Sequence, residues 1–110
     1  MRSVFLNSIQ FKMRKFIIND NQLKMANVEC HFEIAKDHST TKGGGWWHLD
    51  RENKKVYLYN KSIDFGQSKR EDLIEVIKNE AFPLSFDEHK FYHSYSDSLE
   101  VAIAEGVLLN

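Results

Sequence analysis

The element that most constrains the fold is a β-hairpin in the middle of the chain. Residues 46–49 and 55–59 are short runs rich in aromatic and β-branched side chains, and the polar residues 50–54 lie between them. Such side chains favour the pleated surface of a strand, and a polar segment of this length is typical of a turn. The pattern therefore predicts two antiparallel strands joined by residues 50–54.

Three consecutive glycines, Gly43, Gly44 and Gly45, directly precede this hairpin. Glycine loses more backbone entropy than any other residue on entering a regular element, so residues 39–45 are expected to form a loop. A glycine loop leaves backbone N–H groups uncovered, which suits a phosphate group, but glycines also make tight connections with no ligand.

The N-terminal third is less regular. Residues 15–18 predict a strand that ends at the turn-forming residues 19–21. Residues 28–35 fit a strand with alternating apolar side chains, or a helix, and periodicity does not distinguish the two.

Two helices are expected in the C-terminal half. Ser68 followed by Glu71 has the spacing of a capping box and predicts a helix over residues 69–79, which ends before Pro83. Its apolar face would hold Leu73, Ile74 and Ile77. Residues 86–93 predict a strand. Ser96 or Asp97 would then cap a last helix, whose apolar stripe would consist of Leu99, Ala102, Ile103 and Gly106.

Length and charge limit the classes of protein to which the chain can belong. With 110 residues, it is expected to form one domain over residues 13–110, preceded by an irregular extension, residues 1–12. The formal net charge of -1 argues against a nucleic-acid partner. The first 24 residues are basic and residues 71–110 are acidic, so an anionic ligand should bind within the first two thirds of the chain.

Cysteine usage and hydropathy predict the compartment. Cys30 is the one cysteine, so no internal disulfide forms, and the sequence has no zinc-binding cysteine pattern. No run approaches the ~20 apolar residues of a membrane span. We therefore expect a cytoplasmic protein that does not contact membranes.

Several residues could carry chemistry, and each also has a structural interpretation. His31 lies among apolar residues and is either a structural or a catalytic histidine. His89 and His93 are four residues apart but have no accompanying carboxylate at a fixed spacing, which makes them a weak metal site. Trp46 and Trp47 could stack on a ligand, whereas in a hairpin one of them should face the core.

The order of motifs resembles the protein histidine phosphatase family, the Janus/Ocnus-like proteins. The family pattern has a triple glycine, then a Lys-Lys pair, a loop tyrosine, a serine and an aromatic-glycine pair. The corresponding residues here are Gly43-Gly44-Gly45, Lys54-Lys55, Tyr59, Ser62 and Phe65-Gly66. Residues 30–36 are similar to the family's histidine-containing element, and Lys15, with Lys12 as a rival, is similar to the lysine that opens its first strand.

The resemblance implies an α+β fold, a mixed sheet flanked by helices on both faces, with an extra C-terminal helix over residues 98–106. It also implies that a strand reaches about Cys30 and that a helix begins at His31. At that helix start, unpaired N–H groups and the helix dipole would attract an anion.

The function that the resemblance implies is a metal-independent phosphatase for phosphohistidine or a related phosphoamide, with no cofactor. His31 would be the general base. Lys15, Ser62 and the backbone N–H groups near Phe32 and Asp64 would bind the phosphoryl group. The partner would be a phosphorylated protein or a small phospho-ligand.

Three positions depart from the family. Trp46 stands where the family commonly has arginine, Asn60 replaces a glycine, and Asp64 replaces a small residue. A carboxylate that points into the site would repel an anion. The alternative is a non-catalytic module that keeps the fold and uses Trp46, Trp47 and the glycine loop for a protein or small ligand, with Gly44, Gly45 and Trp46 as its candidate contacts.

Overall fold

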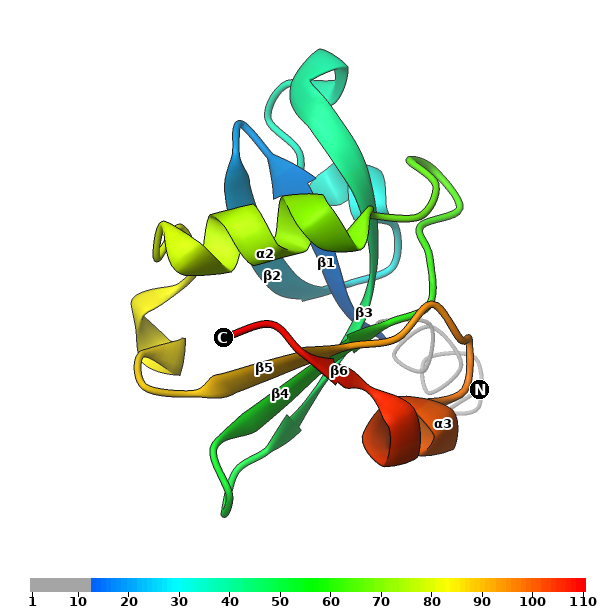
Figure 1. The fold of residues 1–110 in the computed structure, drawn as a ribbon. Helices are drawn as coiled ribbons and strands as arrows, with labels where there is room; N and C mark the ends of the chain where they lie inside the picture. The colour runs from blue at the N-terminus through cyan, green and yellow to red at the C-terminus, as the bar shows by residue number, and fades with distance from the viewer. Residues whose placement is uncertain (1–12) are drawn as a thin grey trace, which may run out of the picture.

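The computed structural model describes residues 13–110, so the expected extension and Lys12 lie outside the described residues. These residues form an α+β fold, a six-stranded mixed sheet with two helices, in the strand order β2-β1-β3-β4-β5-β6 (Figure 1). The strands are β1 (Met13–Asn19), β2 (Gln22–Val28), β3 (Thr41–Asp50), β4 (Lys55–Tyr59), β5 (Lys90–His93) and β6 (Val107–Leu108). The helices are α2 (Arg70–Lys78) and α3 (Leu99–Glu105), and the 3₁₀ turns are η1 (His31–Glu33), η2 (His38–Thr40) and η3 (Leu84–Phe86).

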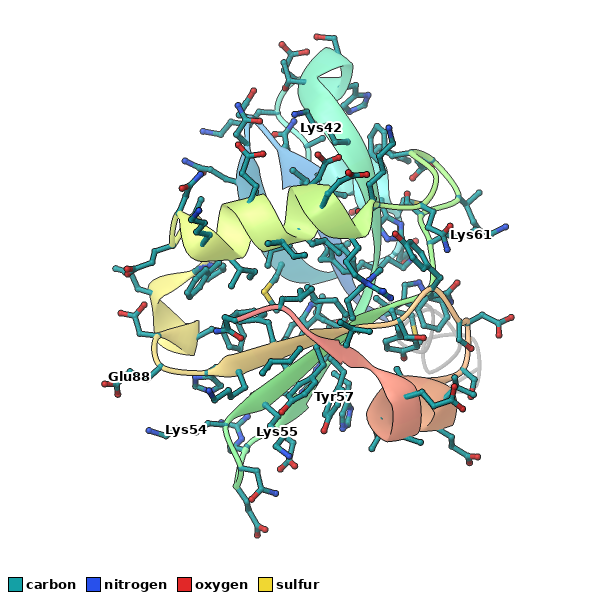
Figure 2. All side chains as sticks on the ribbon, in the orientation of Figure 1. Lys42, Lys54, Lys55, Tyr57, Lys61 and Glu88 are labelled. Atoms are coloured by element: carbon teal, nitrogen blue, oxygen red, sulfur yellow. The ribbon has the colours of Figure 1, made fainter. Side chains whose placement is uncertain are left out.

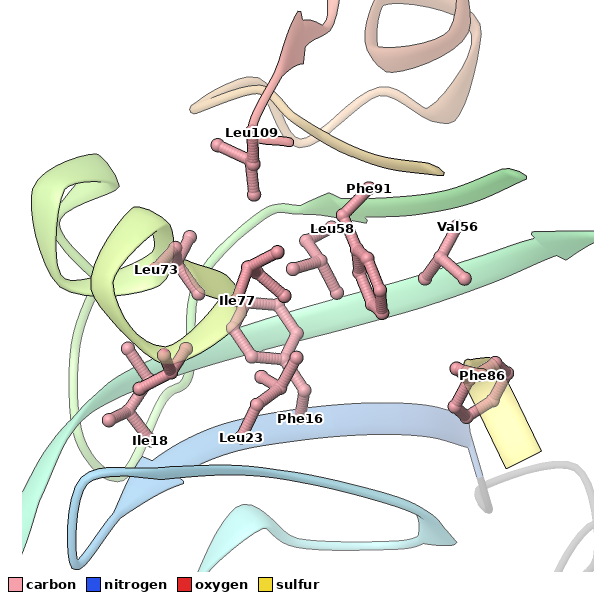
Figure 3. Packing of buried hydrophobic residues seen from close by; sticks show 11 residues of the cluster. Phe16, Ile18, Leu23, Val56, Leu58, Leu73, Ile77, Phe86, Phe91 and Leu109 are labelled. Carbon is pink, nitrogen blue, oxygen red and sulfur yellow. The ribbon is translucent and has the colours of Figure 1, made fainter. Parts of the chain in front are cut away.

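The hydrophobic core lies between the sheet and α2. Alternate residues of each strand point to this side, where they meet the buried apolar side chains of α2, as Figure 3 shows. The cluster consists of Phe16, Ile18, Leu23, Val56, Leu58, Leu73, Val76, Ile77, Phe86, Phe91 and Leu109. Trp47 packs against this cluster, which confirms that one tryptophan of the hairpin faces the core.

The hairpin and α2 form where the sequence places them, but two details of α2 differ. The N-cap residue is Lys69, one position after the expected Ser68, and no side chain caps the helix; the buried Ser68 hydroxyl donates to the Lys42 carbonyl at 3.4 Å. Ile74 is exposed, and Val76 takes its place on the buried face. Within residues 13–110, no helix is long and apolar enough to cross a membrane.

The expectation of a glycine loop was wrong, because the three glycines lie inside β3. A Cβ atom at Gly44 would stand 2.4 Å from the Phe16 carbonyl oxygen, and one at Gly45 would stand 2.4 Å from that of Tyr59. Gly43 has a φ of 75°, which favours glycine. β3 can therefore approach the backbones of β1 and β4 this closely only because these positions have no side chain. This requirement outweighs the backbone entropy that the glycines lose in a strand.

The ambiguous residues 28–35 contain neither a long strand nor an α-helix. β2 ends at Val28, and His31 begins η1, a single 3₁₀ turn. One turn has too few aligned peptide dipoles to provide the helix field expected at His31. An anion near His31 would therefore be attracted by individual backbone N–H groups and not by a helix dipole.

The C-terminal region contains two strands, β5, which the sequence predicted, and β6, which it did not. β5 runs parallel to β4 and is shorter than the expected strand 86–93, since residue 86 lies in η3 and the strand begins only at Lys90. Ser98, rather than Ser96 or Asp97, caps α3 by accepting the Val101 N–H at 3.3 Å. After Gly106 the chain returns to the sheet as β6, antiparallel to β5.

The second helix, α3, packs beside the two tyrosines of the central strands. α3 contacts β4, and a Cβ atom at Gly106 would stand 3.3 Å from the Cβ atom of Tyr92. Tyr92 pairs with Tyr57, and the two rings stack with centroids 5.3 Å apart. Both side chains alternate with the core residues of their strands, so they point away from α2.

Replacing Gly45 by alanine should destabilise the protein by at least about 2 kcal/mol, because the new methyl group meets the Tyr59 carbonyl and the Phe16 ring and forces a backbone shift. Urea denaturation measures the loss. Gly66→Ala is the control, since no atom lies within 4 Å of its Cβ position and only its positive φ opposes the change, at about 1 kcal/mol. Equal losses would show that the close approach at Gly45 is not limiting.

His93 and Arg70 join the start of α2 to the sheet. His93 is 2% exposed, and the Arg70 Nε–H donates to its Nδ1 at 3.0 Å. Burial, together with the positive charge of Arg70, lowers the pKa of His93 to about 4. The imidazole is therefore neutral in the folded protein at neutral pH.

This pKa predicts how stability depends on pH. The unfolded chain binds a proton at His93 below about pH 6.5, whereas the folded chain does so only near pH 4, so stability is fully present above 6.5 and is lost as pH falls toward 4. The free energy of unfolding should fall by about 3 kcal/mol once the pH lies below both pKa values of His93. Urea denaturation between pH 4 and 7 should show a shallower slope for His93→Gln than for wild type. An unchanged slope in His93→Gln would contradict the assignment.

Candidate functional site

A cavity of about 340 Å³ opens on the side of the sheet opposite α2. Its lining comes from β1, the end of β2, η1, β3 and the loop after β4. The lining residues are Lys15, Glu29, Cys30, His31, Trp46, Asn60, Lys61, Ile63 and Asp64. The cavity thus gathers three residues of the expected phosphoryl site, Lys15, His31 and Asp64, from parts of the chain up to 49 positions apart. It also includes Trp46 of the alternative module, whereas Phe32 and Ser62 are not among its lining residues.

Strand alternation explains why these side chains share a face. Phe16 of β1 points into the core, so its neighbour Lys15 points to the other side. Lys15 is paired in register with Trp46 of β3, and Trp46 is paired with Tyr59 of β4. The Trp46 and Tyr59 rings meet edge to face at 6.1 Å. Trp46 is therefore a wall of the cavity, whereas Trp47 belongs to the core.

His31 is held at the base of the cavity. It is 2% exposed, and its Nε2 atom lies 2.7 Å from the Gly45 carbonyl oxygen. A carbonyl only accepts, so the ring proton is on Nε2 and the lone pair of the neutral ring is on Nδ1. Burial lowers the pKa of His31, the Gly45 contact opposes this, the Lys15 charge lowers it further and the Asp64 charge raises it. The result is a neutral imidazole with a basic nitrogen at neutral pH.

The loop after β4 folds around the Ser62 hydroxyl. Ser62 is buried, and its Oγ atom accepts the N–H groups of Asp64 at 3.1 Å and Phe65 at 3.0 Å. Backbone bonds between Ser62 and Gly66 close the loop, and the Gly66 carbonyl accepts the Gly44 N–H at 3.0 Å. The loop is therefore anchored to β3 beside His31.

The two backbone N–H groups expected to hold a phosphoryl group both have acceptors within the chain. The Phe32 N–H donates to Oδ2 of the Asp64 side chain at 3.2 Å, and the Asp64 N–H donates to Ser62. The carboxylate that the sequence analysis identified as a departure thus contacts the amide of η1. The Phe32 ring is half exposed and lies near His38.

The charges around the cavity are mixed. The Lys15 ammonium donates to the Glu29 backbone carbonyl, which orients the lysine without neutralising it. Lys61 adds a second cation, while the side chains of Glu29 and Asp64 bring negative charge. A ligand would therefore meet a mixed electrostatic environment rather than a wholly positive pocket.

Some residues singled out in the sequence lie elsewhere. Gly44 and Gly45 do not line the cavity but lie beneath it, in β3. Lys54 and Lys55 are at the tip of the hairpin, far from Lys61 in the view of Figure 2, and the Lys55 ammonium lies 5.6 Å from the centre of the Tyr92 ring.

The two C-terminal histidines are not brought together as a metal site. His93 contacts Arg70, whereas the Nδ1 atom of His89 lies 3.0 Å from the Asp87 carbonyl. Among the residues that the structure describes, no three His, Cys, Asp or Glu side chains cluster as a metal site would require.

Sequence analysis missed one residue that shapes the site. Asn19, read as part of a turn, ends β1 and is fully buried. Its amide donates to the Asp37 carbonyl at 2.8 Å and to the hydroxyls of Thr40 and Thr41, and its oxygen accepts from Lys24 at 2.8 Å. Asn19 therefore ties the segment after η1 to the sheet. Turn composition alone gives no signal for this role.

No protein-family model, curated protein or solved structure matches this chain.

The state of His31 can be measured directly. A long-range ¹H–¹⁵N spectrum at pH 7 should show a neutral ring protonated at Nε2, because Gly45 can only accept, and the titration should fall below the usual 6.5. Lys15→Met should raise the pKa of His31 and Asp64→Asn should lower it, because each removes the charge that acts in the opposite direction. A ring protonated at Nδ1 would contradict this arrangement.

Proposed function

We propose that this domain is a metal-independent phosphatase-like domain that acts on phosphohistidine or a related phosphoamide. One observation carries the proposal, the convergence of Lys15, His31 and the Ser62 loop on one cavity. These residues come from separate elements, and the sequence gives them the same roles by motif order. The resulting site pairs a neutral base with a cation and backbone donors, which is the equipment that phosphoryl transfer to water needs.

In this scheme the phosphoryl group lies between Lys15 and the N–H groups of Phe32 and Asp64, which exchange their present acceptors, the Asp64 carboxylate and the Ser62 hydroxyl, for phosphoryl oxygens. The Nδ1 atom of His31 takes a proton from a water molecule as the water oxygen forms a bond to phosphorus. The phosphorus–nitrogen bond breaks, its electron pair goes to the leaving nitrogen, and that nitrogen is protonated by solvent. Ser62 holds the loop, and Lys15 balances the charge that develops on the phosphoryl oxygens.

The fold supports the family assignment. The observed mixed sheet with two helices agrees with the α+β fold that the resemblance implies, and α3 would be the additional C-terminal helix. We therefore propose a divergent member of that family. The partner would be a phosphorylated protein or a small phospho-ligand, and Ile63, 95% exposed at the cavity, provides an apolar contact for a protein. The free thiol of Cys30 suits the cytoplasm.

The second candidate is a binding module without catalysis. The observation that favours it is the contact between the Asp64 carboxylate and the Phe32 N–H, which occupies a donor that the phosphatase scheme uses. Such a module would keep the fold and contact its ligand through Trp46 on the cavity wall.

Phosphate release from a phosphohistidine peptide tests the first candidate. His31→Ala should lower turnover at least about 100-fold, the contribution typical of a general base. The wild-type rate should rise with pH through a value below 6.5 and then stay level, because the pKa of His31 is lowered and its neutral form acts.

The matched control is His48→Ala, because His48 lies on the same side of the sheet but outside the cavity lining. Equal turnover in wild type and His31→Ala would exclude His31 as the base. No turnover in any of the three proteins, with the peptide still bound, would favour the binding module.

A further inference from the structure

The Asp64 side chain occupies a position that the proposed function assigns to the phosphoryl group. Its Oδ2 atom accepts the Phe32 N–H at 3.2 Å, and Asp64 lines the same cavity as Lys15 and His31. A carboxylate and a phosphoryl group present the same chemistry to an N–H donor, a negatively charged oxygen acceptor. The two cannot accept from the Phe32 N–H at full strength at the same time.

We propose that Asp64 is an internal competitor for the phosphoryl group, so that the cavity accepts an anion only after this carboxylate leaves the Phe32 N–H. The proposal rests on the proposed function, since it concerns the same cavity. It assigns to Asp64 the control of anion affinity, a role separate from the chemical step at His31.

The loop is built so that the carboxylate can move while the backbone stays in place. The Phe65 N–H is held by the Ser62 hydroxyl at 3.0 Å, and Ser62 and Gly66 exchange two backbone hydrogen bonds that close the loop. The side chain of Asp64 is exposed, so rotation about its χ angles returns the carboxylate to water without unfolding the loop. Displacement therefore costs one solvent-exposed hydrogen bond, which an incoming phosphoryl oxygen replaces.

The surrounding charges explain why this contact matters. Lys15 is oriented by the Glu29 carbonyl, so its positive charge remains available to a nearby anion. Asp64 brings a negative charge to the same cavity. Removing the carboxylate eliminates both the competing acceptor and a negative charge at the cavity. Both effects act in the same direction, toward tighter binding of phosphate.

The test is titration with inorganic phosphate, followed through the ¹⁵N amide signal of Phe32 in the full chain. Asp64→Ala should bind phosphate about tenfold more tightly than wild type, a change typical of one charge-assisted hydrogen bond. Asp64→Asn keeps the size of the side chain and removes only its charge, so its affinity should also exceed that of wild type. Asp87→Ala, which changes the net charge equally but lies outside the cavity lining, should bind like wild type.

The outcomes separate the two proposals. Equal phosphate affinity in wild type, Asp64→Ala and Asp64→Asn, with the Phe32 signal responding in each, would overturn the competitor and leave the phosphoryl site in place. An equal gain in Asp87→Ala would also overturn it, since net charge alone would then explain the effect. No response of Phe32 in any variant would overturn the phosphoryl site itself, and the competitor with it.

Discussion

The structure depends on the absence of side chains at two neighbouring positions of β3. Gly44 and Gly45 lie between β1 and β4, and the volume that their Cβ atoms would need is filled from both sides of the sheet. On one side the Phe16 ring packs over Gly45 as part of the core. On the other side the His31 ring lies over Gly44 and bonds to the Gly45 carbonyl. One short stretch of backbone therefore fixes both the hydrophobic core and the base of the cavity.

The elements that could be predicted from the sequence are those whose cause is local. The aromatic and β-branched strands of the hairpin and the apolar face of α2 are visible within a short window, and both are found. The glycines of β3 could not be placed this way, because their neighbours Phe16, His31 and Tyr59 are remote in the sequence. The Ser68 capping box did not form, because the helix begins one residue later, with Lys69 as its N-cap, and Ser68 is buried against the remote Lys42 carbonyl. β6 is two residues long and has no pattern of its own.

For the candidate site, the order of motifs in the sequence predicted that Lys15, His31 and Asp64 belong to one site. In the fold, all three residues line one cavity. What motif order could not provide is the direction of each polar group. Nothing in the spacing indicates that Asp64 reaches the Phe32 N–H, that His31 is protonated at Nε2, or that Asn19 holds the segment after η1. These are properties of hydrogen-bond partners 14 to 32 residues apart, and they decide what the cavity can bind.

The balance of charge at the cavity bears on selectivity. A pocket with a large excess of positive charge would attract any anion and would discriminate poorly. Here two cations, Lys15 and Lys61, and two carboxylates, Glu29 and Asp64, line the same cavity, and the buried His31 is neutral, so long-range attraction is weak. Affinity for an anion would then come from short-range hydrogen bonds, which depend strongly on geometry and reward a ligand that matches the donors. Under the proposed function, those donors are the N–H groups of η1 and of the Ser62 loop, whose present acceptors lie within the chain. Recognition would then be an exchange of acceptors, controlled by the group that moves at least cost, the exposed side chain of Asp64.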